Sequence, residues 1–156
     1  MQVFLIRHAA AVDETVALRD PQRYLTAQGR SQASELGERL RWHDCEPTHL
    51  WSSPLVRAVQ TAELVAAGLH SPIAVEIVPA LAPDSDVRAV IAAVRALPAD
   101  ACVVVVGHEP ALSAIGAVLA GAEDFAALAK AEAVRLVDGA VRWRFAWNDD
   151  APRAAS

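Results

Sequence analysis

The stretch "ACVVVVGHEP", residues 101 to 110, decides the fold. Every residue from Ala101 to Val106 is apolar. This pattern predicts a strand that is covered on both faces, as in the centre of a parallel sheet. Gly107 and Pro110 then lead into a helix that we expect to end near Gly121. A buried strand that feeds directly into a helix indicates an α/β protein.

The same alternation of short apolar strands and helices continues on both sides of that stretch. We expect strands over 3–6, 48–51 and 73–78, and helices over 28–42, 54–67 and 84–96. Thr26 is the expected N-cap of the first helix, and Asp84 or Ser85 is that of the third. Pro54 is the expected first residue of the second helix, since helices accept proline there.

The C-terminal part has a different pattern, with two alternating segments around a short turn. Residues 133–137 and 141–147 flank Asp138 and Gly139, which predicts an antiparallel hairpin with a two-residue turn. We therefore expect a three-layer α/β/α fold, whose sheet is mostly parallel with a C-terminal antiparallel hairpin. Residues 1–148 would form one domain, and 149–156 a flexible tail.

Composition narrows the class of protein and its partners. The chain has 156 residues, 54% of them hydrophobic, and a formal net charge of −5, which argues against a nucleic-acid or membrane-surface partner. Its apolar runs are too short to span a bilayer, and Arg7 interrupts the first of them, so we expect no signal peptide. The two cysteines, Cys45 and Cys102, are too few for a disulfide scaffold and indicate reduced thiols in the cytoplasm.

Basic side chains follow three of the expected strands. Arg7 and His8 come after the first strand, Arg57 lies at the start of the helix after the second, and His108 follows the all-apolar strand. The carboxyl ends of parallel strands meet at one edge of a sheet, so these four side chains can converge. Gathering positive groups costs electrostatic energy unless an anion relieves it, and guanidinium forks match phosphate oxygens in pairs. The sequence therefore predicts a phosphate site.

Four motifs carry a resemblance to a known family: "RHAAA" at 7–11, "LTAQGRSQA" at 25–33, "SSPLVRAVQTAE" at 52–63 and "VVVVGHEP" at 103–110. In this order and spacing they resemble the histidine phosphatase superfamily, with its phosphoglycerate-mutase-like fold, and in particular its short branch of phosphohistidine phosphatases. The resemblance implies that His8 is the nucleophile and forms a phosphohistidine intermediate. It further implies that Arg7, Arg57 and His108 hold the phosphate oxygens, with no metal or other cofactor. The family has glycine where this chain has Ala9, which bears on how closely the backbone approaches phosphate.

A proton donor is less evident. Larger members of the superfamily place a glutamate after the third strand, whereas the corresponding stretch here, "VPALAPDSD", has Ala80 and Ala82. Asp84 and Glu109 are the nearby carboxylates, and each also fits a role at a helix start. An alkoxide needs general acid help to leave, and an imidazole needs it less. The missing acid therefore favours a phosphoramidate substrate.

Three functions remain open at this point. The first is a phosphohistidine phosphatase acting on a phosphorylated protein of the histidine-containing phosphotransfer type. The second is a phosphomonoesterase for a small phosphorylated metabolite, such as a sugar or nucleotide phosphate, and the third is a non-catalytic module that reads phosphate. A metal site at His43, Cys45 and His49 is disfavoured, because their spacing matches no common zinc pattern.

Overall fold

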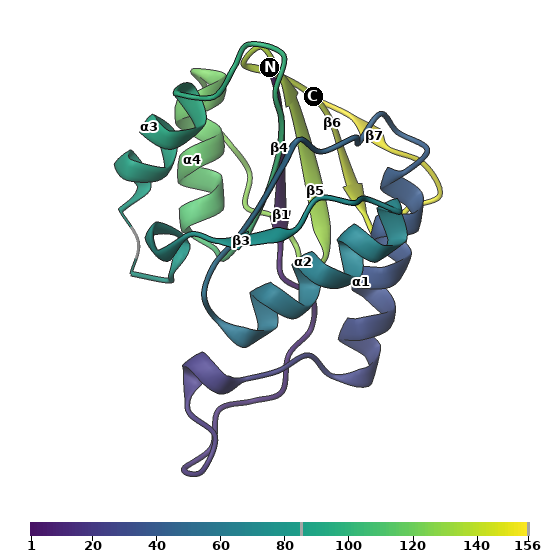
Figure 1. The fold of residues 1–156 in the computed structure, drawn as a ribbon, viewed down its shortest axis with the longest axis vertical. Coiled ribbons are helices and arrows are strands. Elements are labelled where there is room, and N and C mark those ends of the chain that lie inside the picture. Colours follow the sequence, from purple (N-terminus) through teal and green to yellow (C-terminus); the bar gives the residue numbers. More distant parts are fainter. Residues whose placement is uncertain (85, 156) are drawn as a thin grey trace.

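A seven-stranded sheet with helices on both faces forms the core of the computed structural model, which describes residues 1–84 and 86–155 (Figure 1). The strands are β1 (Gln2–Arg7), β2 (His49–Ser52), β3 (Val75–Ile77), β4 (Cys102–Gly107), β5 (Glu132–Val137), β6 (Ala140–Ala146) and β7 (Arg153–Ala154). The α-helices are α1 (Ala27–Leu40), α2 (Val56–Leu69), α3 (Val87–Arg95) and α4 (Ala111–Ala120), and two short 3₁₀ helices are η1 (Asp20–Gln22) and η2 (Pro79–Leu81). None of the helices in these described ranges is long and apolar enough to cross a membrane.

The order of the strands is β3-β2-β4-β1-β5-β6-β7. The first four run parallel, and β5, β6 and β7 add antiparallel pairs at one side. The all-apolar strand β4 lies inside the parallel half, where Val104 pairs with Phe4 on one side and Leu50 on the other. The predicted α/β fold, with its buried parallel strand and its C-terminal hairpin, is confirmed.

Two apolar cores fill the spaces between the sheet and its helices. Side chains alternate across a strand, so Phe4 and Ile6 join the core beneath α1 and α2. Val3 and Leu5 point the other way, into the core beneath α3 and α4. The residues of β4 divide between the two cores in the same manner. A strand that is packed on both faces has little freedom to move. The residues that directly follow its end therefore have well-defined positions.

Helices α1 and α2 approach each other closely because glycines stand at their contact. A Cβ added at Gly37 would lie 2.5 Å from the carbonyl oxygen of Val65, and one at Gly68 would lie 2.6 Å from the backbone nitrogen of Glu38. Such separations are shorter than van der Waals contact, so only glycine permits this spacing. The packing of α2 against α1 fixes where the start of α2, with Arg57, meets the sheet edge.

Two helix starts differ from the sequence expectation. Helix α2 begins at Val56, with Leu55 as its N-cap, rather than at Pro54, so Arg57 is its second residue. Helix α3 is capped by Asp86, whose carboxylate accepts the backbone N–H groups of Arg88 and Ala89. The expected cap Asp84 is therefore wrong, because the chain enters the helix two residues later, and Ser85 lies outside the described residues. Thr26 is confirmed as the cap of α1, since its hydroxyl accepts the N–H of Gly29.

The C-terminal segment contains more structure than expected. The hairpin turn is confirmed, with Asp138 and Gly139 both at positive φ, as a two-residue turn of this type requires. The expected flexible tail, 149–156, differs: β7 pairs with β6, and Arg153 donates to Glu132 and Asp149. The ion pairs of Arg153 hold this segment against the sheet, and Ser156 lies outside the described residues.

The glycine contact between α1 and α2 gives a stability prediction. Replacing Gly37 with alanine inserts a methyl group against the Val65 backbone, so we expect G37A to lower the free energy of unfolding by about 1–3 kcal/mol. Urea denaturation followed by circular dichroism measures this change. The control is S31A on the exposed face of the same helix, which should stay within about 0.5 kcal/mol of the wild type. A G37A variant as stable as the control would contradict the packing argument.

Candidate active site

The structure brings the four basic residues to one edge of the sheet. Arg7 ends β1, His8 follows it, and His108 directly follows β4, the neighbouring parallel strand. The backbone N–H of His8 donates to the carbonyl oxygen of Gly107, and the two imidazole rings lie with centroids 5.1 Å apart. Arg57 enters from α2, and the positive charges of both arginines act on both imidazoles. Residues far apart in the chain thus form one basic cluster, here called the quartet.

His8 has one ring nitrogen ready for attack. Its Nδ1 lies 2.8 Å from the carbonyl oxygen of Ala9, which can only accept, so Nδ1 carries the hydrogen. The lone pair is therefore on Nε2. Burial, opposed in part by the bond to Ala9, and then the nearby His108 and two arginines lower the pKa of His8 to about 3. The imidazole is neutral at physiological pH, which is the form a nucleophile needs.

His108 is held by Ser53, the residue that directly follows β2. His108 Nε2 lies 2.7 Å from Ser53 Oγ, which itself accepts the N–H of Leu55. The serine hydroxyl can donate its hydrogen to Nε2, and in that arrangement the neutral ring carries its own hydrogen on Nδ1. Burial and the charge of Arg57 lower the pKa of His108 to about 4, so this ring is neutral as well.

The two arginines are anchored in the same manner, each by its Nη1 atom. Arg7 Nη1 donates to the carbonyl oxygen of Leu128 over 2.9 Å, and Arg57 Nη1 donates to that of Asp20 over 2.9 Å. Within the described residues, five buried side-chain nitrogens have no hydrogen-bond partner, and three of them are Arg7 Nε, Arg57 Nε and His108 Nδ1. Buried polar atoms are normally paired. Three unpaired atoms in one basic cluster fit an oxyanion that accepts from all of them.

The backbone after β1 is fixed by close contacts with α1 and α2. Ala9 N donates to Thr61 Oγ1, and Thr61 in turn donates to the carbonyl oxygen of Arg57. Gly29 allows α1 to start against this turn, because a Cβ there would lie 1.9 Å from the oxygen of Ala10. Ala9 has no positive φ, and its methyl group belongs to a small buried cluster. Alanine therefore fits where the family has glycine.

The two candidate acids lie in different settings. Glu109 accepts the backbone N–H and hydroxyl of Ser113 through Oε2 and the N–H of Leu128 through Oε1. It thus stabilises the start of α4 and holds the residue whose carbonyl anchors Arg7. The Asp84 side chain is exposed on the segment before α3. Glu109 is a structural acceptor here, and its carboxylate is already engaged.

Sequence reasoning missed three residues that contact the quartet, Ser53, Thr61 and Asp20, and a fourth, Arg23, that contacts Asp20. Ser53 and Thr61 stand inside the motif "SSPLVRAVQTAE", yet their contacts are visible only once β2 and α2 are placed. Asp20 and Arg23 belong to the segment between β1 and α1, which projects beyond the edge of the sheet that carries the quartet (Figure 1). The sequence of that segment shows neither helical nor strand periodicity. The only signal in it is the capacity of its charged side chains to form hydrogen bonds.

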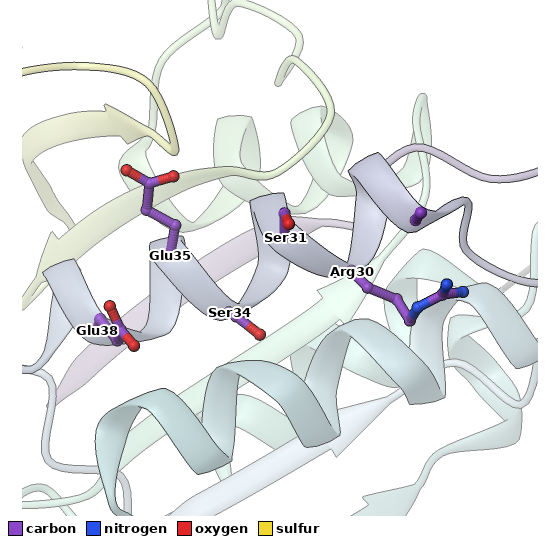
Figure 2. Close-up of a pocket in the computed structure, with 6 residues that line it drawn as sticks. Arg30, Ser31, Ser34, Glu35 and Glu38 are labelled. Carbon is purple, nitrogen blue, oxygen red and sulfur yellow. The ribbon is translucent and has the colours of Figure 1, made fainter.

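Other candidate sites do not join the quartet. The ring of His43 packs edge-on against Trp143 and Phe145, which gives it a structural role. Within residues 1–84 and 86–155, no group of three or more histidine, cysteine, aspartate or glutamate side chains could hold a metal ion. A separate surface hollow, shown in Figure 2, lies on α1 and shares no residue with the quartet; among its lining residues are Arg30, Glu35 and Glu38.

Comparisons with known proteins identify the family and the fold of this chain. The family model of the histidine phosphatase superfamily (branch 1) matches residues 3–82. Phosphohistidine phosphatase SixA of Escherichia coli (strain K12) is 37% identical over 113 residues, which cover 70% of this chain and 68% of that protein. A structure of the protein histidine phosphatase SixA complexed with tungstate matches with a TM-score of 0.85 at 29% identity, over 94% of this chain and 97% of that one. Mycobacterial glucosyl-3-phosphoglycerate phosphatase shares the fold, with a TM-score of 0.65 at 18% identity over 96% and 99% of the two chains.

The lowered pKa values of His8 and His108 predict how stability depends on pH. As pH falls below 6.5, the unfolded chain binds protons on these histidines, while the folded chain binds them only near pH 3 and 4. The unfolded state is therefore favoured progressively over this window, and stability falls with pH. We expect H8Q to lose less stability than the wild type between pH 7 and pH 4.5, as measured by urea denaturation at each pH.

The S31A variant, which changes no titrating group, serves as the control and should keep the slope of the wild type. Equal pH slopes for H8Q and the wild type would mean that His8 is protonated in the folded protein at ordinary acidic pH.

Proposed function

The chain belongs to the histidine phosphatase superfamily, and from that premise we propose that it is a phosphohistidine phosphatase acting on a phosphorylated protein. The observation that carries the proposal is the set of buried, unpaired nitrogens on Arg7, Arg57 and His108 around a neutral His8. A relative that binds tungstate, a tetrahedral oxyanion like phosphate, supports the same role for this cluster. The quartet would bind the phosphoryl group and transfer it to His8.

In the first step, His8 Nε2 attacks phosphorus, and the bond from phosphorus to the substrate nitrogen breaks. The other ring nitrogen of the substrate imidazole takes a proton from water, so the ring leaves as a neutral imidazole with the electron pair of the broken bond, and hydroxide remains in the solvent. Arg7, Arg57 and His108 hold the three equatorial oxygens, where their charge and N–H groups stabilise the transition state. The guanidinium groups supply here the positive charge that magnesium supplies in many other phosphoryl-transfer enzymes.

In the second step, water attacks the phosphohistidine formed on His8. The bond from phosphorus to Nε2 breaks, and the imidazole recovers that electron pair and is neutral again. The attacking water releases one proton to the solvent, which replaces the proton taken up in the first step, and inorganic phosphate leaves. The hydrogen bond from Nδ1 to Ala9 keeps the ring oriented through both steps. No residue of the quartet changes its protonation between the start and the end of the cycle.

The substrate class follows from the carboxylates around the site. Glu109 is engaged by Ser113 and Leu128, so it is poorly placed to protonate an alkoxide. Phosphohistidine releases an imidazole, a leaving group that depends less on an acid. The name of the curated relative, phosphohistidine phosphatase, supports the same class. We therefore place a histidine-containing phosphotransfer protein ahead of a small phosphorylated metabolite as substrate.

The free cysteines support a location in the cytoplasm. Cys45 and Cys102 are both buried and unpaired with each other, and burial raises the pKa of the Cys102 thiol to about 11. Two protonated, inert thiols are typical of a reducing compartment, where phosphotransfer proteins would be met.

The proposed substrate class predicts a preference that can be measured directly. Purified protein should release phosphate from a phosphohistidine protein with a kcat/KM at least ~100-fold above that for sugar or nucleotide monophosphates, the range that general acid help is worth. The activity should persist in excess EDTA. Equal or faster turnover of the esters would replace the proposed function by the phosphomonoesterase, and loss in EDTA would overturn the metal-free mechanism.

The covalent step predicts a trapped intermediate. Rapid quenching in alkali after mixing with ³²P-labelled phosphohistidine protein should leave label on the enzyme, because a phosphorus–nitrogen bond survives alkali and is lost in acid. H8A should carry no label and lose at least ~10³-fold in kcat, while it still binds inorganic phosphate through the remaining three residues. Label on H8A, or full activity of H8A, would point to another nucleophile.

A further inference from the structure

We propose that Asp20 is a positioning residue for Arg57: it holds one edge of the guanidinium group and so turns the other edge toward the phosphoryl group. This inference rests on the proposed function and adds a residue to it. Asp20 opens the short helix η1, on the projecting segment between β1 and α1. It is 37 positions from Arg57 in sequence and touches it through two separate atoms.

The contacts define which edge of the guanidinium group is used. Arg57 Nη1 donates to the backbone oxygen of Asp20 over 2.9 Å, and Arg57 Nη2 donates to its carboxylate Oδ2 over 3.3 Å. An arginine presents two forked edges, one made by the two Nη atoms and the other by Nε with Nη2. Asp20 occupies the first. The second edge includes Nε, which is buried and has no partner among the described residues.

Arg7 repeats this arrangement on the other side of the site. Its Nη1 donates to Leu128 O, and its Nε is likewise buried without a partner among the described residues. Both arginines are therefore tied back through Nη1 and leave the edge with Nε available. Two parallel N–H groups on that edge match two oxygens of a phosphoryl group. The common orientation is what a site for one tetrahedral anion needs.

A second arginine fixes Asp20 itself. Arg23 Nη1 donates to Asp20 Oδ1 over 2.9 Å, and Arg23 Nε donates to the carbonyl oxygen of Val12 over 2.7 Å. The carboxylate thus uses one oxygen for each arginine, and these bonds keep the pKa of Asp20 below its ordinary value. Asp20 is ionised and cannot serve as a proton donor. Its role is to orient Arg57, whose side chain is 6% exposed and has few other partners.

The test uses inorganic phosphate as the probe and the full chain in every variant. Removing the Asp20 side chain leaves the backbone bond but frees Arg57 Nη2, so D20A should weaken phosphate binding, measured by calorimetry, about tenfold. It should lower kcat/KM for a phosphohistidine protein by a similar factor. D20N keeps one acceptor oxygen where aspartate has two, so it should fall between D20A and the wild type. The matched control is E14A, which removes an exposed carboxylate that pairs with Arg19 in the same segment, and it should change neither quantity.

A double-mutant cycle with R57K distinguishes positioning of the Arg57 guanidinium group from a general effect of Asp20 on the segment between β1 and α1. Lysine has no second edge to orient, so D20A in the R57K background should change phosphate binding less than twofold. An equal loss in both backgrounds would mean that Asp20 only shapes the segment, and would overturn the inference. Wild-type binding by D20A would overturn it as well, with the proposed function intact. A wild-type protein that binds no phosphate would overturn the proposed function and this inference together.

Discussion

The site depends on the parallel register of β1 against β4. Arg7 pairs with Gly107, so His8 and His108 leave the sheet side by side, and the N–H of His8 donates to Gly107 O. A slip of one residue would send every side chain of β1 to the opposite face, Phe4 out of its core and His8 away from His108. Because both strands are buried on both faces, the hydrophobic cores that stabilise the fold also fix this register. The geometry of the quartet and the fold are thus stabilised by the same contacts.

The repulsion between the positive charges of the quartet is a second constraint, and it lowers the stability of the folded protein. Two guanidinium groups and two imidazoles stand at one edge, and three of these four side chains are buried. The protein limits the repulsion in two ways: burial and the arginines keep both imidazoles neutral, and Asp20 places a negative charge against Arg57. What is left is a cluster with net positive charge and unpaired N–H groups. A bound phosphoryl group would relieve both, so the clustered positive charge and the unpaired N–H groups, which cost stability, are also the features that favour binding of an anion.

Sequence patterns predict the parts of this protein that follow from local chemistry. The apolar run in β4, the Thr26 cap and the Asp138-Gly139 turn each reflect a preference of a few adjacent residues, and the positions of Arg7, His8, Arg57 and His108 follow from where strands end. Contacts between segments that are distant in sequence cannot be predicted from such local preferences. Asp20 meets Arg57 across 37 residues, and Arg153 meets Glu132 across 21, through segments without periodicity. The start of α2 at Val56 has a similar cause, since Ser53 and Leu55 are used by the turn that holds His108.

In the described part of the chain, the carboxylates of Asp20 and Glu109 are both engaged in hydrogen bonds, and this has a chemical counterpart in the proposed substrate. When phosphohistidine reacts with His8, a phosphorus–nitrogen bond breaks and an equivalent one forms, so the transfer is close to thermoneutral and neither imidazole needs to become a strong base. An ester would trade a phosphorus–oxygen bond for a weaker one and release an alkoxide, which demands a proton at the moment of cleavage. The Glu109 carboxylate accepts hydrogen bonds from Ser113 and Leu128, so it is not available to donate such a proton. Its bond to Leu128 instead fixes the residue whose carbonyl oxygen anchors Arg7. The chain thus uses Glu109 to hold the anchor of Arg7 rather than to donate a proton, which suits a proposed substrate whose leaving group resembles the proposed nucleophile.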